Sequence, residues 1–285
     1  MKFWLPWISE APEQTLAIAK QAEAMGFNGV LVGDHIAVPE NYPSVHPSGH
    51  RVFEADTPFL DPLCTISAMA GATATLQFAS YVYVLPLRDP LTVAKQVGSA
   101  AILSDYRLTL GVGAGWLREE FELMGVDPST RGRRMDEMLE IVQRFWRDGT
   151  TEYQGDFFTI PRCGVYPMPT QTIPVWIGGK SDTALRRAAK YQGWVGMNYS
   201  LAEVESLLVR LKNYRSEASV SSLVNEPMRV FVVVNEKQDQ ALYHKLAALD
   251  VTDTLAMPWP PGSSKYSSLS SKLEAMKDFS DRFLS

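Results

Sequence analysis

Short apolar, β-rich runs alternate with helical patterns along the whole 285-residue chain, and this alternation restricts the folds open to it. The intervening helical segments begin with residues typical of helix starts, such as Pro12, Asp89 and Ser181. Near-continuous apolar strands separated by helices indicate a parallel sheet covered by helices. The runs are residues 2–8, 28–34, 76–85, 107–113, 172–178, 193–197, 228–235 and 251–257.

Eight strand–helix units predict an α/β fold of the closed (β/α)8 barrel type, also called a TIM barrel. Periodicity leaves an open, doubly wound sheet as the alternative. Two connections are unusually long: Ile36–Thr57 after the second strand, and Gly149–Gln171 before the fifth, which contains a predicted hairpin. Loops of this length often cover a site. No domain boundary is visible, so we expect residues 1–285 to form a single domain.

Charge and apolar content narrow the class of protein. The chain has 46% hydrophobic residues and a net charge of −5, with acidic and basic residues interspersed. That balance argues against a nucleic-acid or membrane partner. No signal peptide or membrane-spanning segment is predicted. Cys64 and Cys163 lie far apart in sequence and are interpreted as buried thiols, so we expect a soluble cytoplasmic protein.

The glycine-rich stretch GVGAGW, residues 111–116, does not match the turn of a dinucleotide-binding fold. In that fingerprint a third glycine stands where this chain has Trp116 or Arg118. A second glycine pair, Gly178-Gly179, directly precedes a helix start. Glycines admit a ligand close to the backbone, and the unpaired N–H groups of a helix start attract phosphate. The pair therefore indicates a phosphate site, with a tight turn that binds nothing as the alternative.

His35 is the main candidate for proton transfer. It is one of 4 histidines and directly follows Asp34 at the end of a predicted strand, which is the catalytic end of such a barrel. A neutral imidazole passes protons near neutral pH, although a loop histidine bonded to a backbone carbonyl is the alternative. His46 and His50 fit loop residues better than metal ligands. No metal-binding motif is present, so we predict no metal.

Aromatic side chains gather near the predicted strand ends and in the long second connection. Trp7, Tyr42, Phe53 and Trp116 are our candidates for the wall of a substrate pocket, because several aromatic rings at one barrel mouth suit a planar ring system. The alternative is that they fill the barrel core or its rim.

Three segments together resemble the bacterial luciferase-like superfamily, and within it the branch of oxidoreductases that use the deazaflavin coenzyme F420. They are VGDHIAVP (32–39), the region from VYVLP to QRFW (82–146) and IPVWIGGKSDTALRRAAKYQGWVG (173–196). The resemblance extends from residue 1 to about residue 200. It implies a (β/α)8 barrel with a flavin or deazaflavin ring in its mouth.

The resemblance also assigns site residues. His35 matches a histidine that some deazaflavin enzymes use in proton transfer. The bond Tyr81–Val82 matches a non-prolyl cis peptide in the third strand. The positions that the resemblance places at the cofactor and its phosphate are Asp34, Ser80, Tyr81, Val82, Gly113, Ala114, Gly115, Gly178, Gly179, Gly196 and Met197.

The function implied by the resemblance is hydride transfer between coenzyme F420 and a small organic substrate. An FMN-dependent monooxygenase that uses O2 and a non-catalytic flavin-binding barrel are the alternatives. Trp116 stands where certain sugar-phosphate dehydrogenases of the superfamily have an acid, and it indicates an apolar or aromatic substrate wall. Because superfamily members often form dimers, we expect a homodimer.

Overall fold

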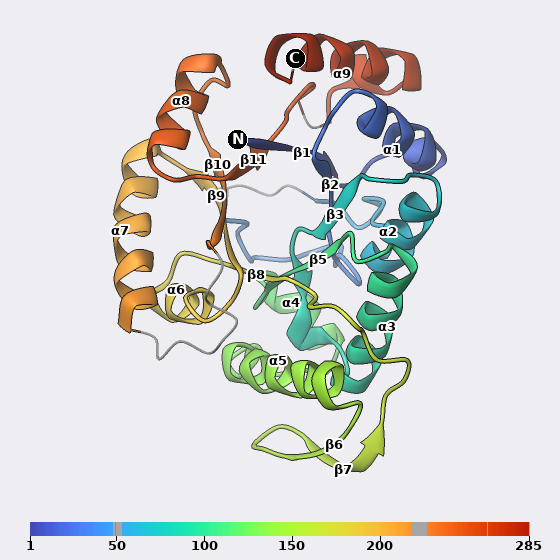
Figure 1. Cartoon of the computed structure of the whole chain (residues 1–285), viewed down its shortest axis with the longest axis vertical. Coiled ribbons are helices and arrows are strands. Elements are labelled where there is room, and N and C mark those ends of the chain that lie inside the picture. The colour runs from blue at the N-terminus through green and yellow to red at the C-terminus, as the bar shows by residue number, and fades with distance from the viewer. Residues whose placement is uncertain (48, 50–52, 218–226, 261, 285) are drawn as a thin grey trace.

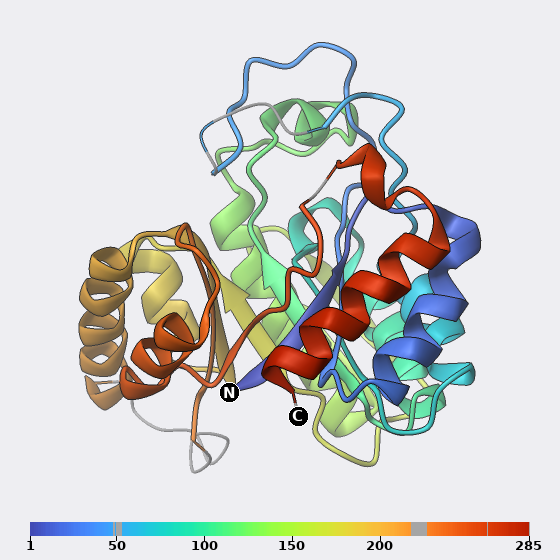
Figure 2. The same cartoon turned by 90° about the horizontal axis from the view of Figure 1, so that it is seen from above.

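The computed structural model describes residues 1–285 except 48, 50–52, 218–226, 261 and 285, so His50 lies outside the described residues. In the described part, parallel strands form a barrel surrounded by helices (Figures 1 and 2). The barrel strands are β1 (Lys2–Trp7), β2 (Gly29–Val32), β3 (Gln77–Ser80), β4 (Tyr83–Val84), β5 (Leu108–Gly113), β8 (Val175–Gly178), β9 (Gly193–Tyr199), β10 (Arg229–Val234) and β11 (Asp253–Leu255).

The order of hydrogen-bonded neighbours shows that the sheet closes on itself. It runs β3–β2–β1–β11–β10–β9–β8–β5–β4, and an additional parallel pairing of β3 with β5 completes the ring. The predicted (β/α)8 barrel is therefore confirmed, and the open doubly wound alternative is wrong.

One predicted strand, residues 76–85, is two short strands in the structure. β3 ends at Ser80, the peptide bond Tyr81–Val82 is cis, and β4 begins at Tyr83. β3 pairs with β2 and β5, whereas β4 pairs with β5 alone. The prediction of one continuous strand is therefore wrong, because the hydrogen-bond ladder is interrupted at Tyr81–Val82. The cis peptide bond that the resemblance implied is confirmed.

Helices pack around the barrel, and side chains cap the predicted starts at Asp89 and Ser181, whereas the start at Pro12 has no side-chain cap. The Asp89 carboxylate accepts the N–H of Thr92, and the Ser181 hydroxyl accepts the N–H of Ala184. In the described part of the chain, no helix combines the length and apolar character needed to cross a bilayer. The helices are α1 (Thr15–Ala24), α2 (Pro62–Gly71), α3 (Pro90–Leu103), α4 (Arg118–Leu123), α5 (Arg131–Asp148), α6 (Asp182–Ala188), α7 (Leu201–Glu217), α8 (Gln240–Ala248) and α9 (Leu269–Phe283), with short 3-10 turns η1 (Pro12–Gln14), η2 (Leu85–Leu87) and η4 (Ser264–Tyr266).

The two long connections have different structures. Residues 36–57 contain no regular helix or strand among the residues described there. Residues 149–171 contain the predicted hairpin, formed by the antiparallel strands β6 (Thr150–Gln154) and β7 (Thr159–Gly164).

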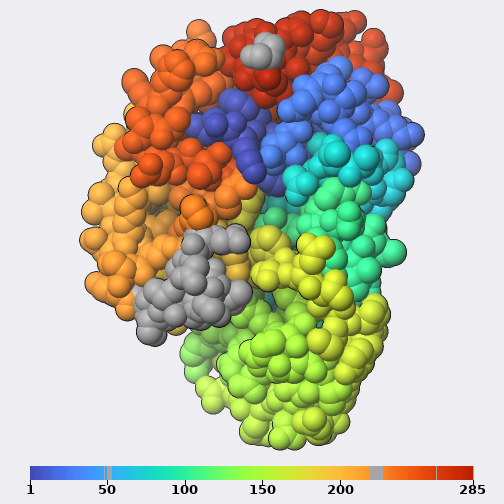
Figure 3. All heavy atoms as spheres, in the orientation of Figure 1, coloured from blue at the N-terminus to red at the C-terminus, as the bar shows by residue number. Residues whose placement is uncertain are grey.

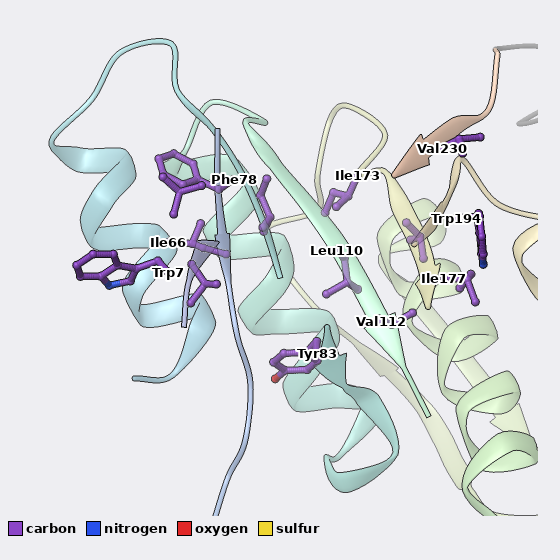
Figure 4. Close-up of a cluster of buried hydrophobic side chains, with 14 of the residues drawn as sticks. Trp7, Ile66, Phe78, Tyr83, Leu110, Val112, Ile173, Ile177, Trp194 and Val230 are labelled. Atoms are coloured by element: carbon purple, nitrogen blue, oxygen red, sulfur yellow. The ribbon is translucent and has the colours of Figure 1, made fainter. Parts of the chain in front are cut away.

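The strands bury apolar side chains on both faces, because successive residues of a strand point in opposite directions. Side chains such as Leu110, Val112 and Ile177 belong to the core between barrel and helices (Figure 4). The barrel interior is filled by Trp4, Leu31, Ala79, Trp176, Val195, Phe231, Val233 and Leu255. Because side chains fill both cores, a binding site is expected at the carboxyl ends of the strands and not inside the barrel.

The two cysteines differ from their prediction. Cys64 is exposed, Cys163 is partly buried, and both are free thiols. The interpretation as buried thiols is wrong for Cys64, because this residue lies in the first turn of α2 and its neighbours Leu63 and Thr65 occupy the buried face.

Glu23, on α1, secures the turn that leads into β3. Its Oε1 accepts the N–H groups of Ala74 and Leu76, each at 2.9 Å, and both the N–H and the hydroxyl of Thr75. These hydrogen bonds, that from the Thr75 N–H foremost, lower the pKa of Glu23 from 4.5 to about 2. The carboxylate form therefore stabilises the folded chain.

We expect Glu23→Gln to unfold at a lower temperature than the wild type at pH 7. A depressed carboxyl pKa stabilises the fold above the unfolded-state pKa and loses this effect as pH falls through the folded value. The difference in Tm between the two proteins therefore shrinks as pH falls from 4.5 towards about 2. Thermal unfolding followed by circular dichroism measures it, with the exposed Glu13→Gln as control. A Tm difference that is constant with pH would contradict the assignment.

Candidate functional site

The carboxyl ends of the barrel strands meet at one end of the molecule, which we call the barrel mouth. In Figure 2 the strands rise towards this end, where the connection after β2 and helix α4 lie. The interior side chains below the mouth are buried, but Tyr81, Val82 and Met197 pack on the same inner cluster and are only partly buried. These three residues form an apolar layer, the mouth platform, which suits one face of a flat ring.

Val82 lies between the ends of β5 and β8. A Cβ added to Gly113 would fall 2.6 Å from Val82 Cγ2, so this position needs glycine to accommodate Val82. A Cβ on Gly178 would fall 3.4 Å from Val82 Cγ1, an ordinary contact. The hydroxyl of Ser80, just before the cis bond, donates to the carbonyl of Gly111 over 2.8 Å. The structure therefore brings Val82, Gly113 and Gly178 together at the mouth, and their contact with a cofactor stays a prediction.

Trp194 connects the turn after β8 with the end of β9. Its indole N–H donates to the carbonyl of Gly179 over 2.8 Å, and its ring would lie 2.6 Å from a Cβ on Gly196. Gly179 has a φ of +118°, which side chains rarely adopt. The protein itself thus requires glycine at 179 and 196. At Gly178 a Cβ would meet protein atoms only at 3.4 Å or more, so the protein does not require glycine there, and a ligand beside it stays a prediction.

Helix α6 begins directly after the glycine pair. The Ser181 hydroxyl accepts the Ala184 N–H over 3.2 Å, so this N–H is already satisfied. Asp182, in the first turn, accepts hydrogen bonds from Arg210 at 2.6 Å and from Tyr214. The Tyr214 bond, followed by that of Arg210, lowers the pKa of Asp182. A phosphate at this turn would therefore meet the backbone N–H groups beside a carboxylate that Arg210 already neutralises.

His35 forms a pair with Glu120 at the carboxyl end of β2. Its Nδ1 lies 2.8 Å from Glu120 Oε2, and the two side chains are only 7% and 1% exposed. The other oxygen, Oε1, accepts the N–H groups of Ile36 at 2.6 Å and Ala37 at 3.2 Å. Because a carboxylate only accepts hydrogen bonds, we infer that Nδ1 carries a proton, which leaves Nε2 as the nitrogen that exchanges one.

Aromatic rings surround this histidine. The ring of His35 lies 5.0 Å from Phe59, 5.4 Å from Phe53 and 5.7 Å from Trp116, measured between centroids. Tyr42 contacts Trp116 at 5.9 Å and donates its hydroxyl to the Phe53 carbonyl over 2.7 Å. His46 lies 5.1 Å from Trp116. We call these residues (Tyr42, His46, Phe53, Phe59 and Trp116) the aromatic cluster, which shields His35 from water.

Asp34 pairs with Arg88 behind the mouth. The guanidinium donates two hydrogen bonds to the Asp34 carboxylate, at 2.6 and 2.7 Å, and lies 4.1 Å above the Tyr83 ring. The Val84 N–H also donates to Asp34, at 2.7 Å. Burial raises the pKa of Asp34, and Arg88 opposes this rise. Asp34 thus bonds to protein groups, namely Arg88 and the Val84 N–H. A direct contact between Asp34 and the cofactor stays a prediction.

Three other predicted residues lie outside these groups. Trp7 belongs to the core between barrel and helices, where its indole donates to the Thr15 hydroxyl over 3.2 Å, and it also lines a small cavity together with Phe59 of the aromatic cluster. Gly115 has a φ of +86°, and a Cβ there would fall 2.6 Å from the Phe121 ring. Ala114 is partly buried against the outer core.

Sequence reasoning missed Glu120, Arg88 and Phe59. Glu120 looks like an ordinary acid in the first turn of a helix, where acids are common. Only its contacts with residues 35–37, more than 80 positions away, distinguish it. Arg88 and Phe59 likewise carry no local signal. Among the residues that the structure describes, no group of three or more histidine, cysteine, aspartate or glutamate side chains is placed to hold a metal ion.

Comparison with known proteins identifies the family. An uncharacterized protein of Mycobacterium tuberculosis is 39% identical over 222 residues, which cover 76% of this chain and 75% of the relative. Two solved structures share the fold over nearly the whole of both chains. The monooxygenase RslO1 from Streptomyces bottropensis is 18% identical with a TM-score of 0.75, covering 100% of this chain and 99% of its own. The coenzyme F420 dependent tetrahydromethanopterin reductase from Methanopyrus kandleri is 14% identical with a TM-score of 0.74, covering 99% and 98%. The model of the family described as luciferase-like monooxygenase matches residues 6–280, and the chain therefore belongs to this family.

Proposed function

We propose that the protein is an oxidoreductase in which a hydride passes between coenzyme F420 and a small organic substrate while His35 transfers the proton. The observation that carries the proposal is the buried His35–Glu120 pair at the end of β2, beside a mouth that presents an apolar platform and glycines. The fold shared with the F420 dependent reductase of Methanopyrus kandleri supports the choice of cofactor.

The residues at the mouth fit a phosphorylated tricyclic ring. Tyr81, Val82 and Met197 would support the ring face, and Gly178 with the N–H groups at the start of α6 would approach the phosphate. When bound, F420 supplies the hydride chemistry. The protein binds and orients the reactants and keeps water out.

Each partner of His35 has a definite task in this proposal. Glu120 holds Nδ1 protonated and fixes the orientation of the ring, so Nε2 gives or takes the proton of the substrate. Glu120 is itself held by the N–H groups of Ile36 and Ala37, so the chain after β2 fixes the position of both members of the pair. The aromatic cluster supplies the apolar wall against which a small organic substrate would lie.

An FMN-dependent monooxygenase is the second candidate function. It is supported by the family model, which is that of luciferase-like monooxygenases, and by the fold shared with the Streptomyces bottropensis monooxygenase. The mouth platform and Gly178 would serve an FMN ring and phosphate in the same way.

A cofactor titration tests the two candidates. The purified apo protein is titrated with F420 and with FMN under the same conditions, and binding is followed by fluorescence. We expect F420 to bind about tenfold more tightly or better. Tighter binding of FMN, together with oxygen uptake when reduced FMN and a substrate panel are added, would replace the hydride-transfer proposal by the monooxygenase. Failure to bind either compound would remove both.

We expect Gly178→Ala to weaken cofactor binding by about tenfold without unfolding the barrel. The added methyl meets protein atoms only at 3.4 Å or more, so the fold accepts it, but it blocks the approach of a phosphate to the backbone. Titration of the variant with the preferred cofactor measures the change. Gly71→Ala, at an open position at the end of α2, is the matched control. If Gly178→Ala bound the cofactor as tightly as the wild type, the cofactor phosphate would not lie at this turn.

A further inference from the structure

Strand β9 contains a bulge at the barrel mouth. Its register with β10 shifts between Val232 and Val234. Two residues of β9, Met197 and Asn198, therefore lie opposite the single residue Val233 of β10. Bulges are rare between parallel strands, and they are found preferentially next to active sites, where they redirect a side chain. The bulge therefore indicates that a side chain at this point of β9 has a specific position to fill.

The bulge brings one additional residue to the inner side of β9. Val195 and Met197 belong to the cluster inside the barrel, as the alternation of a strand requires. Tyr199 would follow on the same side, yet it belongs to the outer core, where its ring stacks on Trp194 with centroids 6.3 Å apart and planes 8° apart. The alternation is therefore reset at Asn198, which leaves this residue beside Met197 at the edge of the mouth platform.

The backbone of Asn198 is held in a conformation that favours glycine. Its φ is +60°, and its carbonyl accepts the side-chain N–H of Asn235 over 2.9 Å. The backbone N–H of Asn235 donates in turn to the Tyr199 carbonyl, also over 2.9 Å. Glycine adopts such a φ without steric cost, so the bulge by itself does not require a side chain at this position.

The carboxamide of Asn198 is available to a ligand. Among the residues that the structure describes, none forms a hydrogen bond with this side chain. Asn198 is only partly buried, and its amide atoms retain accessible surface. A carboxamide carries both donors and an acceptor, so at the edge of an apolar platform it suits a neutral group that also carries both.

We propose that Asn198 is a further cofactor-binding residue and that its carboxamide binds the imide edge of the flavin or deazaflavin ring. The inference rests on the proposed function but not on the choice between F420 and FMN, because both rings carry an imide N–H between two carbonyl groups. The Asn198 amide donates to a ring carbonyl and accepts the imide N–H, while the adjacent Met197 supports the face of the same ring. A side chain that the bulge holds in place makes these bonds with little loss of conformational freedom.

Titration of Asn198→Gly with F420 and with FMN tests the contact. Glycine keeps the left-handed backbone and removes the carboxamide, so we expect Tm to stay close to that of the wild type while the affinity for both cofactors falls about tenfold. Asn198→Asp keeps the shape of the side chain but removes its donors and adds a charge. It should weaken binding at least as much.

Asp105→Gly is the matched control for the change of backbone. Asp105 has a φ of +52° and is exposed in the turn from α3 to β5. This turn belongs to the amino-terminal face of the barrel, opposite the mouth, and that face is turned towards the viewer in Figure 3. We expect Asp105→Gly to bind both cofactors as the wild type does.

A cofactor methylated at the imide nitrogen identifies the bonded edge of the ring. The methyl group removes the N–H that Asn198 accepts, so the wild type should bind N3-methyl-FMN about tenfold more weakly than FMN, whereas Asn198→Gly should bind the two about equally. An equal loss on methylation in both proteins, or unchanged affinity of Asn198→Gly for both cofactors, would overturn the contact and leave the proposed function intact. A wild type that binds neither F420 nor FMN would remove the proposed function and this inference with it.

Discussion

Replacing His35 by Gln is expected to lower turnover by about 10²–10⁴-fold, the usual contribution of a general acid or base, while cofactor affinity changes little. Gln retains a polar side chain of similar length that can still bond Glu120, but it cannot exchange a proton near neutral pH. The buried Nδ1–carboxylate bond fixes the ring, so the loss falls on kcat rather than on binding. Turnover is followed by the absorbance of the cofactor, with the substrate that a panel screen identifies.

His46→Gln is the matched control for this prediction. His46 is also a histidine of the connection after β2 and contacts the same Trp116 ring at 5.1 Å, but the proposal gives it no proton. We expect its turnover to stay within a few-fold of the wild type, since it has no part in the proton transfer proposed for His35. Equal losses in both variants would mean that packing around Trp116, and not proton transfer, explains the effect of His35.

Glu120 is a positioning residue in this scheme, and a double-variant comparison separates its role from mere packing. Glu120→Gln is expected to lower turnover less than His35→Gln, because the imidazole keeps a hydrogen-bonding neighbour but loses the carboxylate that orients its ring. In the double variant, turnover should equal that of His35→Gln alone. Independent, multiplicative losses would show that Glu120 does not act through His35.

The fold could be predicted from the sequence because the same strand–helix pattern repeats along the chain. The barrel strands are mostly apolar, and several of the helices begin at a capping residue such as Asp89 or Ser181, whose capping bonds are present in the structure. Patterns of this kind depend on residues within a few positions of one another. The break in the third predicted strand escaped periodicity, since Tyr81–Val82 lies inside an uninterrupted apolar run.

The candidate site was predictable only in part, because its contacts join distant segments. His35 could be named from its place after a buried strand, but its partner Glu120 is 85 positions further along and looks like a solvated acid. Trp7 was grouped with Tyr42 and Trp116 as a pocket residue; it packs in the outer core and lines a small cavity with Phe59, and its contact with a substrate stays a prediction. In the glycine turns, the protein itself explains Gly179 and Gly196 through Trp194, which no local motif reveals.

Arg88→Leu is expected to destabilise the protein by about 3–5 kcal/mol at pH 7, as when one partner of a buried ion pair is removed. The Asp34 and Arg88 side chains are only 1% and 12% exposed, and Arg88 donates two hydrogen bonds to the carboxylate. Without them, Asp34 retains the Val84 N–H alone and bears a buried charge. Urea unfolding measures the change. Arg144→Leu is the control, since it breaks the exposed pair with Glu140 and should cost less than about 1 kcal/mol.

The pH dependence of Arg88→Leu distinguishes a buried charge from lost packing. Burial already raises the pKa of Asp34, and removal of Arg88, which opposes that rise, raises it further. A carboxyl whose folded pKa exceeds its unfolded value favours folding at low pH and loses this effect as pH rises through the folded pKa. The deficit of Arg88→Leu relative to the wild type should therefore shrink as pH falls from 7 towards 5, and Asp34→Asn/Arg88→Leu should recover part of it at pH 7. A deficit independent of pH, with no recovery in the double variant, would assign the loss to the contact of Arg88 with Tyr83, since the charge of Asp34 would then have no part in it.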